Sequence, residues 1–191
     1  MRIVIKIGTS TLAHPTGHLN IRRVEQLCEI MSDIKNAGHE LILVSSGAIG
    51  MGVGKLGLRE KPKDIPSKQA AAAVGQCELM YIYDKLFTEY NHIVAQILIT
   101  APDLQEAGSR KRNFHNTLAR LLELGALPVI NENDAVATDE IGVDNTIEIW
   151  AKEKAEQPFM NPEEFSEALQ DILGEENLGE EEAETSDKSV E

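Results

Sequence analysis

Several features that would assign this chain to a familiar class of protein are missing from its sequence. It has only two cysteines, Cys28 and Cys77. Both lie in predicted helices, so we expect buried thiols in a reducing compartment rather than a disulfide framework. No run of about 18 apolar residues is present, and Met1 leads directly into a strand-like segment without the parts of a signal peptide. We therefore expect a cytoplasmic protein that does not bind a membrane.

Positive charge is also scarce, and the negative charge is unevenly placed. The formal net charge is −14, of which residues 151–191 contribute −11, from fourteen acidic residues and three lysines. No basic stripe remains that would bind a nucleic acid. The Glu-rich end has few large apolar residues, so we predict one possible helix over 161–173 and disorder after 174.

The short motifs of several enzyme classes are absent. The sequence contains no Gly-x-x-x-x-Gly-Lys phosphate loop and no Gly-x-Ser-x-Gly hydrolase motif. Its histidines show neither metal-ligand spacing nor a nucleophile partner, so we predict no metal site and place them on the surface or in loops. They are His14, His18, His39, His92 and His115.

The first 130 residues do contain a regular alternation of short apolar strands and helices. Strands are predicted at 3–7, 41–44, 93–99 and 127–130, and helices at 21–37, 67–90 and 114–124. Continuous apolar strands separated by helices predict a parallel sheet that is covered on both faces. The expected fold class is therefore α/β, a three-layer α/β/α sandwich.

Polar or glycine residues follow each of the four predicted strands. They are Lys6 to Ser10, Ser45 to Gly47, Thr100, and Asn131 to Asp134. In parallel α/β sheets, ligands bind outside the carboxyl ends of the strands. These residues therefore predict a ligand site at that edge of the sheet.

Each of these groups also has a purely structural interpretation. Lys6 can reach a phosphate while Gly8 admits backbone N–H groups, or it can be a surface lysine. The glycine-rich turn predicted over 46–54 can bind an anion, or it can simply be flexible. Asp134 can accept from a substrate ammonium while the nearby asparagines donate to a carboxylate, or the segment can serve only as a turn.

Four segments of the sequence resemble the glutamate 5-kinases of the amino-acid kinase family. They are residues 4–10 (VIKIGTS), 44–49 (VSSGAI), 67–76 (SKQAAAAVGQ) and 129–138 (VINENDAVAT). The resemblance runs collinearly from about Met1 to Asn145. The last segment is the most specific, because other amino-acid kinases share the first two loops but not that one.

The resemblance implies ATP-dependent phosphorylation of L-glutamate to L-glutamate 5-phosphate, the first committed step of proline synthesis. It implies that Lys6 is catalytic and contacts the transferred phosphoryl group, with Gly8 and Thr9 beside it at the ATP. It assigns Ser46, Asp134 and Asn145 to glutamate binding. It further implies a requirement for Mg²⁺, feedback inhibition by proline, and a homo-oligomer.

The resemblance ends after Asn145. The family continues with Gly-Asp-Asn-Asp, whereas residues 143–146 of this chain read VDNT, so Thr146 replaces an aspartate that orients the catalytic lysines. Nothing similar to the nucleotide-binding half follows. We therefore expect the substrate-binding half of a kinase domain over 1–145 and a divergent tail over 146–191, as a truncated form without measurable activity. A non-catalytic glutamate-binding or oligomer-modulating paralogue is the alternative.

Overall fold

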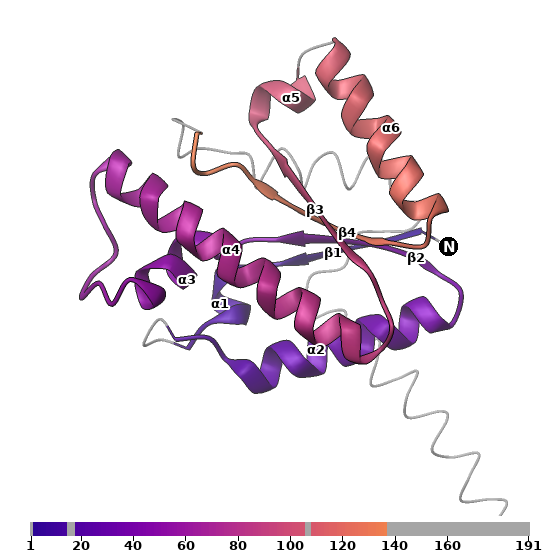
Figure 1. Ribbon diagram of the computed structural model, residues 1–191, viewed down its shortest axis with the longest axis horizontal. Helices are drawn as coiled ribbons and strands as arrows, with labels where there is room; N and C mark the ends of the chain where they lie inside the picture. The colour runs from indigo at the N-terminus through magenta and orange to yellow at the C-terminus, as the bar shows by residue number, and fades with distance from the viewer. Residues whose placement is uncertain (1, 15–17, 106–107, 137–191) are drawn as a thin grey trace, which may run out of the picture. The chain divides into compact units, whose positions relative to one another are not determined.

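The computed structural model describes residues 2–14, 18–105 and 108–136, and its described strands form one parallel sheet. The strand order is β1-β2-β4-β3 (Figure 1). The strands are β1 (Arg2–Ile7), β2 (Glu40–Ser45), β3 (Val94–Ile99) and β4 (Leu127–Glu132). The fold class and the four strands predicted from the sequence are confirmed.

Helices cover both faces of this sheet. They are α1 (Thr9–Leu12), α2 (Ile21–Asn36), α3 (Ala48–Lys55), α4 (Ile65–Glu89), α5 (Ala101–Gln105) and α6 (Ser109–Glu123). The crossovers from β1 to β2 and from β2 to β3 run in one direction across the sheet, whereas the crossover from β3 to β4 runs back. Right-handed crossovers therefore place α2 and α4 on one face and α6 on the other (Figure 1).

The boundaries of several elements differ from those expected. Helix α4 begins at Ile65, two residues before the predicted start, because Asp64 is its N-cap and accepts the N–H of Ser67 at 2.9 Å. Helix α6 begins at Ser109 instead of Phe114. Two further short helices, α1 and α5, leave little periodic signal because each is about one turn long.

The prediction of a glycine-rich turn over 46–54 is wrong for most of that segment, because residues Ala48–Lys55 form helix α3. Among the glycines of residues 46–54, only Gly47, with φ of 101°, adopts a conformation that favours glycine. The glycines allow α3 and α4 to touch through their backbones. A Cβ atom at Gly52 would lie 1.8 Å from the Ala71 carbonyl oxygen, and one at Gly75 would lie 1.7 Å from that of Ala48.

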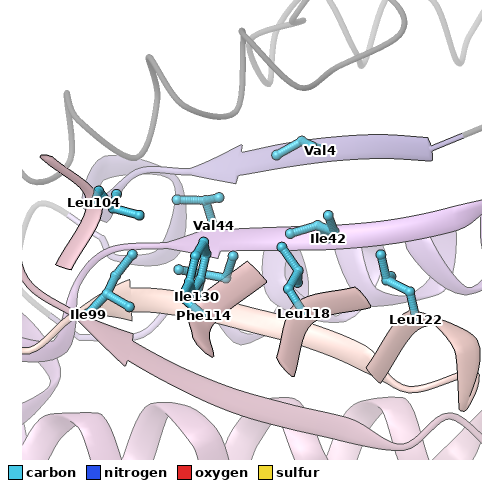
Figure 2. Packing of buried hydrophobic residues seen from close by; sticks show 9 residues of the cluster. All are labelled: Val4, Ile42, Val44, Ile99, Leu104, Phe114, Leu118, Leu122 and Ile130. Atoms are coloured by element: carbon cyan, nitrogen blue, oxygen red, sulfur yellow. The ribbon is translucent and has the colours of Figure 1, made fainter. Parts of the chain in front are cut away.

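An apolar cluster fills the space between the sheet and helices α5 and α6 (Figure 2). Strand residues and helix residues interdigitate in it, with Phe114, Leu118 and Leu122 spaced about one turn apart on α6. The full cluster consists of Val4, Ile42, Val44, Ile99, Leu104, Phe114, Leu118, Leu122 and Ile130. It packs α5 and α6 against the sheet and so stabilises the fold.

The cysteines and histidines agree only partly with expectation. Cys28 is buried, and that burial, together with the nearby Glu25 charge, raises the pKa of its thiol to about 12. Cys77 is exposed on α4, so its predicted burial is wrong. His92 lies in the loop between α4 and β3, as predicted, although its Nε2 is buried. The predicted domain boundary at 145, the tail over 146–191, its possible helix over 161–173 and the disorder after 174 lie outside the described residues.

No helix in the described ranges is both long and apolar enough to cross a membrane.

Candidate functional site

The loops that follow β1 and β2 lie side by side at the carboxyl edge of the sheet. The two strands are paired along their whole length, with Lys6 opposite Val44 and Ile7 opposite Ser45. One residue further on, the N–H of Ser46 donates to the Ile7 carbonyl at 3.0 Å. Lys6, predicted to contact a phosphoryl group, and Ser46, predicted to bind substrate, are therefore held at the ends of adjacent strands.

Thr9, the first residue of α1, packs against the start of α3. A Cβ atom at Gly47 would lie 3.8 Å from the Thr9 Cα, and one at Gly50 would lie 3.7 Å from the Thr9 Cγ2. Gly8 is different, because among the described residues a Cβ atom there would meet nothing within 4 Å, and its φ of −81° suits any residue. Neither space nor backbone geometry requires a glycine at position 8, which leaves close approach of a ligand as a physical reason for it.

Helix α3 starts directly after the short loop that follows β2. Gly47 is its N-cap, and no side chain in the described part of the chain caps it. The N-terminus of a helix bears a partial positive charge and N–H groups that can bind an anion. This edge of the sheet thus has a helix start and Lys6, both of which suit a negatively charged ligand.

The segment from Asn131 to Asp134 reaches the same edge from β4, which lies next to β2. Asn131 and Glu132 complete the strand, and the N–H of Asn133 donates to the Ile99 carbonyl of β3 at 2.8 Å. A turn then follows, closed by the Val136 N–H on the Asn133 carbonyl at 3.0 Å, and it contains the half-buried Asp134.

Two buried polar pairs lie beneath this edge, between the sheet and α4. The Ser45 and Tyr83 hydroxyls are 2.9 Å apart, and Asn131 Nδ2 donates to Gln76 Oε1 at 2.8 Å. Burial raises the pKa of the Tyr83 hydroxyl more than the hydrogen bond with Ser45 lowers it, so Tyr83 stays neutral. Sequence reasoning missed both pairs, although Gln76 and Tyr83 are two turns apart on one face of a predicted helix.

Thr100, the polar residue that follows β3, has a local structural role. Its N–H and its Oγ1 both donate to Asp103 Oδ2 at 2.7 Å, which caps the start of α5. Burial alone would raise the pKa of Asp103, but these hydrogen bonds and the Arg110 charge outweigh it and hold the pKa below its usual value. Capping of α5 therefore explains the polar residue at the end of β3 without a ligand.

The structure thus brings Lys6, Gly8, Thr9 and Ser46 together, and places Asp134 at the end of a neighbouring strand. Asn145, the remaining predicted site residue, lies outside the described residues. Within the described ranges, no three His, Cys, Asp or Glu side chains are grouped so that they could hold a metal ion.

Comparison with known proteins gives a family and a set of relatives. The model of the amino acid kinase family matches residues 1–153. Glutamate 5-kinase of Clostridium perfringens is 56% identical over 140 residues, covering 73% of this chain and 52% of the relative. That of Moorella thermoacetica is 55% identical over 142 residues, covering 74% and 37%. The chain therefore spans about half the length of these curated relatives, or less.

Among solved structures, the isopentenyl phosphate kinase of T. acidophilum aligns with a TM-score of 0.48 and 17% sequence identity. The alignment covers 73% of this chain and 58% of that one.

Proposed function

The chain belongs to the amino acid kinase family, and we propose that it forms the glutamate-binding half of an ATP-dependent glutamate 5-kinase. The observation that carries this proposal is the meeting of three loops at one edge of the sheet. The loops after β1 and β2 are in contact, and the end of β4 lies beside β2. The names of the relatives support glutamate as the substrate that such an edge would bind.

We propose a group at this edge for each kind of charge on glutamate, the ammonium and the carboxylate. We propose that the Asp134 carboxylate accepts hydrogen bonds from the substrate ammonium, because a charge-assisted bond of this kind is short and strong. Ser46 and the start of α3 would hold a carboxylate through hydroxyl and backbone N–H donors. Asn145 completes the set that the family resemblance assigns.

The proposed reaction is the attack of the side-chain carboxylate of glutamate on the terminal phosphorus of ATP. A carbon–oxygen–phosphorus linkage forms, the bond to the bridging oxygen breaks, and ADP leaves. Catalysis of such a transfer is mainly positioning and neutralisation of charge. Lys6 would offset the charge of the phosphoryl group, and the open side of Gly8, with Thr9, would admit its oxygens.

Mg²⁺ fits this proposal as an ion that enters with ATP. Magnesium at such sites is usually held by substrate phosphates together with one or two carboxylates, and would supply further neutralisation of charge. The same family resemblance supports feedback inhibition by proline, a homo-oligomer and a cytoplasmic location, which belong to the proposal.

Titration of L-glutamate into the chain by isothermal calorimetry tests the substrate. We expect the wild-type chain to bind and Asp134→Ala to weaken binding by at least about tenfold, the effect of losing one charge-assisted hydrogen bond. Asp84→Ala is the matched control, because it removes an exposed carboxylate from α4. Circular dichroism should show the same fold for all three chains.

Two results would contradict the proposal. Absence of glutamate binding by the wild-type chain would refute the substrate. Equal affinities for the wild-type, Asp134→Ala and Asp84→Ala chains would refute the role of Asp134 and move the site elsewhere.

A further inference from the structure

Gln76 carries a buried polar atom that has no partner in the part of the chain that the structure describes, namely its Nε2. The residue is 8% exposed and lies on the covered face of α4, with Ala72, Leu79 and Tyr83. A methionine would fill the same space without leaving a buried N–H group unpaired. Packing therefore does not explain why a glutamine occupies this position.

The hydrogen bonds of Asn131 fix the direction in which the Gln76 side chain points. Asn131 Oδ1 accepts the backbone N–H of Glu132 at 2.9 Å, so Nδ2 is the atom that faces α4 and donates to Gln76 Oε1. Because a backbone N–H determines the orientation of Asn131, Gln76 must present its oxygen, and its Nε2 is left over. The unpaired Nε2 is thus a consequence of having Gln76 Oε1 in place as the acceptor for Asn131.

Asn131 connects α4 to the segment that carries Asp134. It is 2% exposed, and both of its polar atoms are engaged, one with Gln76 and one with the backbone of Glu132. Glu132 ends β4, and the turn with Asp134 begins immediately afterwards. A buried, oriented network of this kind selects one arrangement of the groups that it joins.

We propose that Gln76 is a positioning residue for the substrate site. Its Oε1 fixes Asn131, and Asn131 fixes the backbone that presents Asp134. This inference rests on the proposed glutamate site and adds a residue that does not itself touch the substrate. It requires an acceptor oxygen at position 76, and it does not require the N–H group of the glutamine.

Three variants of the full chain test this requirement. Gln76→Met removes the acceptor but keeps the length of the side chain. Gln76→Glu keeps an oxygen that can accept from Asn131, whether or not the carboxyl group is protonated. Tyr83→Phe is the matched control, because it breaks the neighbouring buried pair, with Ser45, two turns along the same face of α4.

Two measurements are made on each chain: glutamate affinity by calorimetry and hydrogen exchange of the Glu132 amide by NMR. We expect Gln76→Met to weaken glutamate binding about tenfold, as for one lost buried hydrogen bond, and to reduce protection of the Glu132 amide. Gln76→Glu and Tyr83→Phe should keep both the affinity and the protection of the wild-type chain.

The outcomes separate this inference from the proposed function. Unchanged affinity in Gln76→Met, or an equal loss in Gln76→Glu or Tyr83→Phe, would overturn it. If the wild-type chain does not bind glutamate, the proposed function fails. The hydrogen-exchange protection of the Glu132 amide then tests the role of Gln76 by itself. Loss of protection in Gln76→Met alone supports positioning, and unchanged protection overturns it. Gln76→Leu replaces Gln76→Met should the latter not fold.

Discussion

On the α6 face of the sheet, nine buried residues form a purely apolar cluster, whereas the opposite face combines apolar packing with buried polar groups. The buried polar residues among those described are Ser32, Ser45, Gln76 and Asn131. Ser32 donates to the carbonyl of Cys28 within α2. The other three lie between the sheet and α4, towards the carboxyl ends of the strands.

This difference indicates that the α6 face contributes mainly to stability, whereas the α4 face also positions particular groups. Apolar contacts are non-directional, so many combinations of residues of similar volume can fill the α6 face. Hydrogen bonds between buried side chains are directional, so the Gln76–Asn131 pair on the α4 face can fix particular atoms beneath the proposed site. The α4 face also contains the backbone contact between α3 and α4, which tolerates no added atom.

Gly75→Ala should produce the largest loss of stability, because its Cβ would lie 1.7 Å from the Ala48 carbonyl oxygen and 2.4 Å from the Gly52 nitrogen. Both are backbone atoms, so two helices must move apart. We expect a cost above about 3 kcal/mol, at the upper end for overpacking. Urea denaturation followed by circular dichroism measures it.

Gly50→Ala is the control for this prediction, since its Cβ would meet only the Thr9 Cγ2, at 3.7 Å. That variant should be as stable as the wild-type chain or slightly more stable, because alanine is the better helix former. Similar stabilities for the Gly75 and Gly50 variants would show that α3 and α4 are not in backbone contact.

Leu118→Ala should have the next largest effect on stability. It tests the α6 face of the sheet, whereas Gly75→Ala tests the α4 face. Leu118 is 5% exposed in the apolar cluster on α6, so its truncation leaves a cavity. We expect the free energy of unfolding to fall by about 2–3 kcal/mol. This is towards the low end for a buried leucine, because α6 lies on the outside of the sheet and can move inward to reduce the cavity. Glutamate affinity should stay unchanged, and a weakened affinity in the folded variant would contradict the separation of the two faces.

The Ser45–Tyr83 pair should have the smallest effect of the three. We expect Tyr83→Phe to cost about 1 kcal/mol, because Ser45 Oγ retains the Ser46 carbonyl as an acceptor, at 3.3 Å. A double-mutant cycle with Ser45→Ala isolates the coupling between the two hydroxyls. A coupling of zero would mean that the contact between the two hydroxyls adds nothing to stability.

The sheet could be predicted from sequence because its strands are short apolar runs with glycine or polar residues after them. The same reasoning misread residues 48–55, since glycine usually weakens a helix. Whether Gly52 and Gly75 break a helix or allow two helices to touch depends on which helices meet. That information lies in the tertiary structure and not in any local window of the sequence.

The predicted site also has a part that local sequence predicts and a part that depends on tertiary contacts. Lys6, Ser46 and Asp134 could be placed at one edge because each is near the end of a predicted parallel strand. The contribution of Gln76 could not, because it depends on a contact between residues 55 positions apart in the chain. Helical periodicity places Gln76 on the buried face of α4, but it does not identify its partner.

The position of β4 in the sheet has a consequence for how the chain folds. It is the last described strand in sequence and lies between β2 and β3, so these two strands never pair with each other. During synthesis, β1 and β2 can pair early, but β3 must wait for β4 to emerge from the ribosome. Until then, the edge of β2 is open to pairing with other chains. The slow step of folding should therefore be the insertion of β4, which closes a long loop before its contacts form.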